Sequence, residues 1–151
     1  PSGFLGGMPL AMAVGLGDQT LLRATGLRPW PADKVLLTDG RDLDPGERDN
    51  LAAAAIAHVR DVESLLQPGA LPAGPLYVHF DVDIIDPAQM QAVNYPAPGG
   101  PSAQLVTDLL RALAATGRVV AVSVSTWDAA LDPDGHAQAV AQAALNTVFG
   151  R

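Results

Sequence analysis

Residues 79–87 read His-Phe-Asp-Val-Asp-Ile-Ile-Asp-Pro, an apolar run that ends in three carboxylates and a proline. The residues from Leu76 to Phe80 are the aliphatic and aromatic types of a short buried strand. Side chains two apart on a strand share one face, so Asp81 and Asp83 can bind one cation or a close pair of cations. Asp86 lies beyond this pattern, because the proline that follows it ends the strand, and it is the weaker candidate ligand. Ligands of open parallel sheets bind at this carboxyl end of the strands.

Other interpretations of the acidic cluster compete with a cation site. Aspartates that follow a strand often only accept hydrogen bonds from backbone amides in a turn. Two carboxylates on one face of a buried strand, however, are unfavourable unless a cation or a proton lies between them. An EF-hand loop is excluded because Ile85, Asp86 and Ala92 are the wrong residue types at its fifth, sixth and twelfth positions. The Asp-x-Asp motif of manganese-binding nucleotide-sugar transferases remains open on the bare motif.

Hydrophobic periodicity and cap residues predict alternating helices and strands. Helices are expected at about residues 8–15, 18–25, 45–66, 102–115 and 135–149, and strands at 35–38, 76–80 and 119–125. Ser102 and Gly117 are typical cap residues for the fourth helix. Near the third helix, Arg41, Asp44 and Glu47 are predicted to be turn and helix N-terminal residues. This order predicts an α/β protein with a parallel sheet and helices on both faces.

Composition and charge exclude several classes of function. The net charge is −7, and the basic residues are Lys34 and eight scattered arginines, so we expect no nucleic-acid partner. The chain has no cysteine, which excludes disulfides, thiolate nucleophiles and zinc fingers. No apolar run approaches the roughly 18 residues of a membrane span, and no signal peptide is visible. We therefore expect a cytoplasmic protein without a membrane partner.

Three segments carry a family resemblance. Residues 80–100, with Phe-Asp-x-Asp-x-x-Asp-Pro, a proline-containing loop and Gly-Gly, resemble the metal-ligand signature of the arginase and agmatinase (ureohydrolase) family. Residues 2–10 resemble the family's S-G-N-x-H-G-M-P-L loop, and residues 39–47 resemble its G-x-R-D-x-D-P-x-E turn. The segments follow the family's order, so the resemblance covers residues 2 to about 134. It implies a three-layer α-β-α fold with a mostly parallel, arginase-like sheet.

The resemblance also implies a metal centre that this chain contains only in part. Family members bind two manganese ions through six ligands, and the first four come from G-G-D-H and D-A-H-x-D segments that precede the S-G loop. Neither segment occurs here, and the chain begins at Pro1 where they would end. We therefore expect residues 1–151 to be the C-terminal half of one arginase-like domain, with a partial sheet. Asp81 and Asp83 are its two expected manganese ligands, and we expect this half alone to be inactive.

The function implied by the resemblance is hydrolysis of a C–N bond in a guanidino or amidino small molecule. The full-length protein is expected to hold two Mn²⁺ per subunit and to form a homo-oligomer. The family's proton-shuttle histidine corresponds to Gly6, its substrate-binding asparagine to Phe4, and the glutamate with which arginases pair the guanidinium to Thr126. These departures predict a substrate other than free arginine. They also leave open a non-catalytic relative that acts as a structural or assembly module.

Further site candidates follow from position in the chain. His79 replaces the serine usual before the acids and, by strand parity, faces the same way as they do, so it is a candidate proton shuttle, extra ligand or ligand-orienting group. The alternative is a packed histidine. Asp128 is close enough to Thr126 in sequence to supply the missing negative charge. Tyr95 and Trp127 lie in loops after strand ends, where they either line the mouth of the substrate pocket or simply pack.

Overall fold

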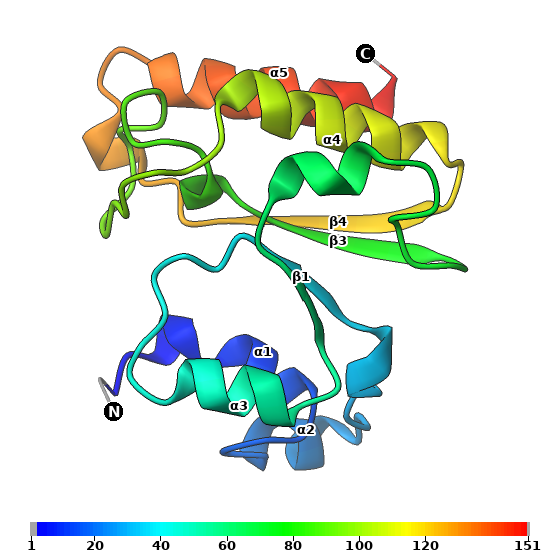
Figure 1. The fold of residues 1–151 in the computed structure, drawn as a ribbon. Coiled ribbons are helices and arrows are strands. Elements are labelled where there is room, and N and C mark those ends of the chain that lie inside the picture. Colours follow the sequence, from blue (N-terminus) through cyan, green and yellow to red (C-terminus); the bar gives the residue numbers. More distant parts are fainter. Residues whose placement is uncertain (1–2, 151) are drawn as a thin grey trace. The chain divides into compact units, whose positions relative to one another are not determined.

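The computed structural model describes residues 3–150, which divide into two compact units (Figure 1). The first unit contains the chain up to Leu37 together with Asp42–His58. The second contains Thr38–Arg41 and the chain from Val59 onward. Asp81, Asp83 and most other candidate residues therefore belong to the second unit.

The first unit is built mainly from short helices. These are α1 (Pro9–Ala13), α2 (Thr20–Thr25) and α3 (Glu47–Ala53), with 3₁₀ turns at Leu5–Gly7 and Ala32–Lys34. The start of α3 is as predicted, because the Glu47 carboxylate accepts a hydrogen bond of 2.6 Å from the backbone N–H of Asp44. Strands β1 (Leu36–Thr38) and β2 (Ala57–Val59) pair in a two-stranded sheet, and the division between the units cuts both strands.

The predicted helix over residues 45–66 is wrong in its second half. Helix α3 ends at Ala53, and the next residue has an extended backbone. Strand β2 and a 3₁₀ turn at Val62–Leu66 follow instead of further helix. The backbone N–H of Ala57 donates to the carbonyl of Val35 at 3.1 Å, so pairing with a distant strand outweighs the helix propensity of the local alanine run.

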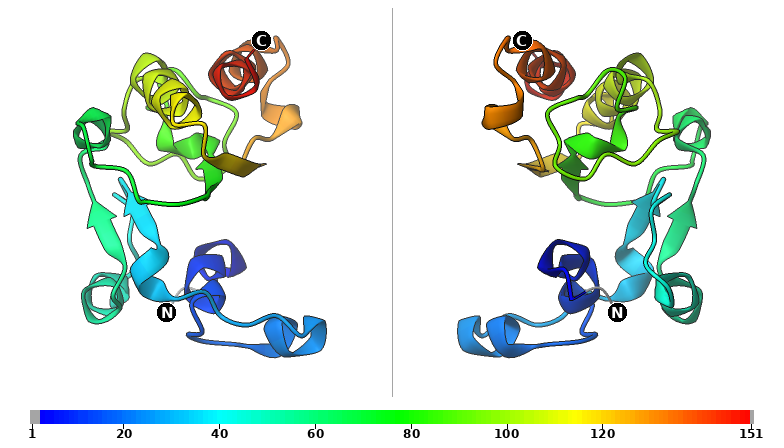
Figure 2. Two further views of the ribbon diagram at one scale, coloured as in Figure 1. Left: turned by 90° about the vertical axis from the view of Figure 1, so that its right-hand side faces the viewer. Right: turned by 90° about the vertical axis from the view of Figure 1, so that its left-hand side faces the viewer.

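The second unit has a parallel strand pair covered by two long helices. Strands β3 (Leu76–Asp81) and β4 (Val119–Ser125) are parallel, as predicted. Helices α4 (Ala103–Ala115) and α5 (His136–Phe149) lie side by side on one face of this pair (Figure 2). The core contains buried residues of β3, of the turn and loop that follow it, and of both helices, namely Phe80, Val82, Ile85, Met90, Ala92, Val93, Val106, Leu110, Ala137, Ala141 and Ala144.

Local signals in the sequence account for the ends of both long helices. The Ser102 hydroxyl accepts a hydrogen bond of 3.1 Å from the N–H of Leu105, which caps α4 as predicted. Gly117 follows α4 with φ +65°, a conformation that favours glycine. The Asp132 carboxylate accepts hydrogen bonds from the N–H groups of Ala137 and Gln138 at 2.9 and 2.8 Å and so holds the first turn of α5.

None of the helices within residues 3–150 combines the length and the apolar character that a membrane crossing requires.

Candidate functional site

The acidic turn, defined here as Asp81 to Ile84, joins strand β3 to the loops that follow it. Strand β3 ends at Asp81, and Val82–Ile84 forms a 3₁₀ turn. Asp83 is therefore not on the strand, and the strand-parity argument does not apply to it. The turn nevertheless places the two carboxyl groups near enough for the charge of Asp81 to raise the pKa of Asp83. Val82 between them is fully buried, which fixes the turn in the hydrophobic core.

The electrostatics of the acidic turn favour an added positive charge. The Oδ1 atom of Asp81 is buried and has no hydrogen-bond partner within the described residues. Burial, followed by the charge and hydrogen bond of Asp81, raises the pKa of Asp83 to about 6. The nearby Arg41 opposes this rise, but its effect is smaller. A pair of hard oxygen donors with an unsatisfied buried atom fits a divalent cation such as Mn²⁺.

The pair of acids supplies only part of a metal site. Within residues 3–150, no group of three or more His, Cys, Asp or Glu side chains is arranged to hold a metal ion. The two acids fit the pair of ligands that the family resemblance implies for this chain.

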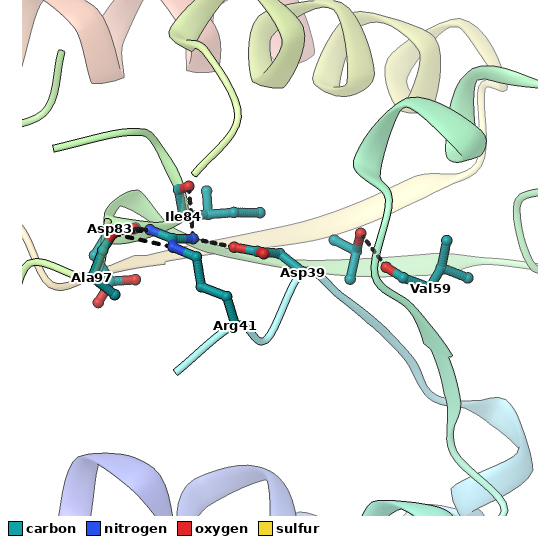
Figure 3. Close-up of polar contacts among 7 residues, drawn as sticks. Asp39, Arg41, Val59, Asp83, Ile84 and Ala97 are labelled. Carbon is teal, nitrogen blue, oxygen red and sulfur yellow. Dashed lines mark hydrogen bonds and ion pairs between the residues drawn. The ribbon is translucent and has the colours of Figure 1, made fainter. Parts of the chain in front are cut away.

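Arg41 connects the acidic turn to two other segments of the second unit (Figure 3). Its Nη2 donates to the carbonyl oxygens of Asp83 at 2.8 Å and Ala97 at 2.9 Å, and its Nη1 donates to the carbonyl of Ile84 at 3.1 Å. Its Nε also donates to Ala97, at 3.1 Å, and Nη1 forms an ion pair with Asp39. The guanidinium therefore binds the main chain of the turn and pairs with a different carboxylate.

The role of Arg41 was not predicted beyond a place in a turn. Its partners lie 42, 43 and 56 residues away in the sequence, so no local pattern reveals them. The local signal is the pair Asp39 and Gly40, which both have positive φ, 61° and 58°. This tight turn lets the side chains at 39 and 41 meet.

Gly100 marks the closest approach between the acidic turn and the loop before α4. A Cβ atom at this position would lie 2.3 Å from the carbonyl oxygen of Ile84, 2.8 Å from the nitrogen of Asp86 and 2.9 Å from Nη2 of Arg41. The N–H of Asp86 donates to the carbonyl of Pro101 at 2.9 Å. Only glycine allows this contact, which explains the second glycine of the Gly-Gly pair.

Asp86 behaves as a turn residue. Its Oδ1 accepts a hydrogen bond of 2.8 Å from the N–H of Ala88. This geometry agrees with its rank as the weaker candidate ligand.

His79 lies on the exposed face of β3, the same face as Asp81. Its Nδ1 is 2.7 Å from the hydroxyl of Ser123, and its Nε2 is 3.2 Å from the hydroxyl of Ser125. The Tyr77 hydroxyl is 2.6 Å from Ser123, so a row of hydrogen-bonded side chains runs across β3 and β4. Each ring nitrogen of His79 thus lies next to a serine hydroxyl. These two contacts orient the ring on the same face of β3 as Asp81.

The loop after β4 contains the other predicted substrate-binding residues. Thr126 has φ +73°, a left-handed conformation that is strained for a β-branched residue. The Asp128 carboxylate accepts hydrogen bonds from Asn94 Nδ2 at 3.1 Å and from the N–H of Ala130 at 2.9 Å. Asp128 therefore connects two loops, which is a structural role that its sequence position did not reveal.

The two aromatic candidates differ in their surroundings. Trp127 donates from Nε1 to Asp132 at 3.1 Å, and its ring lines an apolar hollow with Val82, Val124 and residues of α5. Neither acid of the turn lines this hollow. Tyr95 is 67% exposed on its loop. The structure thus places His79 on the same face of β3 as Asp81, whereas Trp127 lines a separate hollow.

Comparison with known proteins gives a consistent assignment. The sequence model of the arginase family matches residues 1–150. The chain is 31% identical over 142 residues to the N(omega)-hydroxy-L-arginine amidinohydrolase of Streptomyces lavendulae, covering 93% of this chain and 50% of that protein. It is 29% identical to the arginase of Brevibacillus brevis, covering 99% and 54%. The arginase structure from Bacillus subtilis superposes with a TM-score of 0.90 at 22% identity, covering 100% of this chain and 57% of that one.

The superposition agrees with the predicted arginase-like α/β fold, and the chain spans about half the length of the curated relatives it matches. With the family model matched over nearly all of its residues, the chain belongs to the arginase family.

Proposed function

We propose that the full-length protein containing this chain is a manganese-dependent hydrolase that cleaves a C–N bond in a guanidino or amidino small molecule other than free arginine. This chain is the C-terminal half of its arginase-like domain and supplies Asp81 and Asp83 to a centre for two Mn²⁺ ions. The protein is cytoplasmic and forms a homo-oligomer.

The buried, unpartnered Oδ1 of Asp81 is the observation that carries this proposal. A buried carboxylate oxygen without a partner is destabilising unless a proton or a cation compensates it. Burial also raises the pKa of the adjacent Asp83, and the charge of Asp81 adds to the rise. Bound Mn²⁺ would remove both penalties.

The chemistry follows from the family and from the donor atoms. Water adds to the carbon of the guanidinium or amidine group, and a C–N bond breaks to release urea or a related product. When bound, the metal ions supply the activation of this water. Asp81 and Asp83 would hold the ions, and His79, which Ser123 and Ser125 contact, lies on the same face of β3 as Asp81.

The substrate class is supported by a relative and by Thr126. The relative that is 31% identical is named for N(omega)-hydroxy-L-arginine, a modified guanidine. Thr126 is neutral and cannot form the ion pair that a glutamate would form with a guanidinium. We therefore expect modified or shorter guanidines to be better substrates than arginine.

The test combines metal analysis with a substrate screen of the full-length protein. We expect two manganese ions per subunit after loading with Mn²⁺, and release of urea or ammonia from at least one of Nω-hydroxyarginine, agmatine, guanidinobutyrate, guanidinopropionate and formiminoglutamate, in preference to arginine. Absence of bound manganese after loading would refute the proposal.

A non-catalytic structural or assembly module is the second candidate. It is favoured by the two serine contacts of His79 and by Gly6, which has no side chain at the position of the family's proton shuttle. A protein that binds two manganese ions but releases no product from any of these compounds would support the module.

A further inference from the structure

We propose that Arg41 is a positioning residue for the metal centre, which holds the acidic turn in the conformation that presents the carboxylates of Asp81 and Asp83 to Mn²⁺. The inference rests on the proposed function, because it concerns the same manganese site. It assigns a role to a residue that is not one of the two predicted ligands.

The contacts of Arg41 converge on the acidic turn and its neighbouring loop. The guanidinium donates to the carbonyl oxygens of two consecutive turn residues, Asp83 at 2.8 Å and Ile84 at 3.1 Å. It also donates twice to the carbonyl of Ala97, at 2.9 and 3.1 Å, in the loop that precedes Gly100 (Figure 3). One side chain therefore fixes the distance between the turn and this loop.

The atom that Arg41 contacts on Asp83 is important for the argument. The guanidinium binds the main-chain carbonyl of Asp83, and the ion pair that it forms is with Asp39. The side-chain oxygens of Asp83 are consequently not taken up by a hydrogen bond to Arg41. The main chain of this ligand is fixed while its side chain stays available to a cation.

Burial and charge make the arrangement stable. The side chains of Arg41 and Asp39 are only 16% and 13% exposed. A buried guanidinium needs a compensating charge, and Asp39 provides it from two residues away. The pair adds no net charge beside the acids, so it orders the turn without a strong repulsion of the incoming metal.

The geometry requires arginine in particular. A guanidinium has five N–H donors in a rigid planar fork, and here they reach three carbonyl groups and one carboxylate. A lysine would keep the charge but has a single ammonium group and cannot span these acceptors. Arg41→Lys therefore separates charge from positioning.

The main alternative is that Arg41 only stabilises the fold. Arg118 is a matched control for this role, because it is also in the second unit and donates from Nη1 to two main-chain carbonyls, those of Pro72 and Gly74. These carbonyls lie before β3 rather than at its carboxyl end. Loss of Arg118 also removes side-chain hydrogen bonds to main-chain carbonyls, two in number, at a place without contact to the acidic turn.

The test measures Mn²⁺ affinity of the full-length protein by titration calorimetry, alongside the unfolding midpoint of the metal-free protein. We expect Arg41→Lys and Arg41→Ala to weaken Mn²⁺ binding by about 10–100-fold, the range typical of groups that orient metal ligands. Arg118→Ala is expected to lower the unfolding midpoint but to bind Mn²⁺ like the wild type. Amide hydrogen exchange at Ile85 and Asp86 should quicken in Arg41→Lys and stay unchanged in Arg118→Ala, a readout that does not need metal or a fully stable alanine variant.

The possible failures are distinguishable. Equal Mn²⁺ affinity of the wild type and Arg41→Lys would overturn this inference and leave the proposed function standing. An equal loss of affinity in Arg118→Ala would overturn it too, because a general loss of stability would then explain the effect. A wild-type protein that binds no Mn²⁺ would overturn both the inference and the proposed function.

Discussion

Replacing Asp81 with asparagine removes one negative charge from the acidic turn with almost no change in shape. In the metal-free protein, this charge is the second cause, after burial, that raises the pKa of Asp83 from 3.8 to about 6. We therefore expect Asp81→Asn to make the metal-free protein more stable near neutral pH. The same change removes a metal ligand, so we expect Mn²⁺ binding to be lost or greatly weakened.

The magnitude follows from the pKa of Asp83. Ionising a group with this pKa near neutral pH costs about 3 kcal/mol more in the folded than in the unfolded chain. Asp83 is half-buried, so solvent screening reduces this figure, and burial accounts for the larger part. We expect the charge of Asp81 alone to account for about 0.5–1 kcal/mol. The free energy of unfolding of the metal-free variant should exceed that of the wild type by this amount.

The dependence on pH has a definite sign. Because the pKa of Asp83 is higher in the folded than in the unfolded protein, the folded state binds the proton more tightly between pH 3.8 and about 6. The penalty is fully present above about pH 6 and disappears as the pH falls through this range. The stability advantage of Asp81→Asn should therefore be largest above pH 6 and vanish near pH 4.

The assay is urea unfolding of the full-length wild type and variant at several pH values, each with and without Mn²⁺. Without metal we expect the variant to be the more stable protein at pH 7.5. With Mn²⁺ at about 100 times its dissociation constant, the wild type should gain about 2.7 kcal/mol and become the more stable one. If the order stays the same with and without metal, or if the variant is less stable at pH 7.5 without metal, the reasoning about the acidic turn is wrong.

Three further substitutions test separate parts of the structure. Gly100→Ala should lower the free energy of unfolding by about 1–3 kcal/mol and weaken Mn²⁺ binding, since its Cβ would overlap the carbonyl of Ile84. Gly99→Ala is the control: Gly99 has φ +85° and open space around the new Cβ, so its change in stability reports backbone strain alone. Ser102→Ala should cost about 1 kcal/mol of stability, measured by urea unfolding, and leave Mn²⁺ affinity unchanged, because it removes only the cap of α4. His79→Ala should reduce turnover of the full-length enzyme with manganese content unchanged, and normal turnover would remove His79 from the mechanism.

Elements with strong local signals were predictable from the sequence. Strand β3 and helix α4 were predicted almost to the residue, because a bounded apolar run and a serine cap act through neighbours in the chain. The error at residues 45–66 has the opposite cause. The alanine run favours helix locally, but β2 forms there because it pairs with β1, a strand about 20 residues earlier. Such pairing has no local signature.

The candidate site shows the same division. Asp81 and Asp83 stood out because two carboxylates at the end of a buried strand are unfavourable without a cation or a proton between them, although the turn rather than strand parity brings them together. Arg41 did not stand out, since its four acceptors are assembled only when the chain folds. The place of Asp128 as a substrate contact stays a prediction, and its link between two loops could not be predicted because its partner Asn94 lies 34 residues away.

Acids and core residues alternate from Asp81 to Ile85, and this limits which substitutions the segment tolerates. Val82 and Ile85 are almost completely excluded from solvent, so the segment that carries the acids is as constrained as the interior of the domain. Tyr95 and Trp127, in contrast, are 67% and 40% exposed on their loops, although buried residues such as Val93 lie nearby. Substitutions at these two exposed side chains should therefore disturb the interior less than substitutions at Val82 or Ile85.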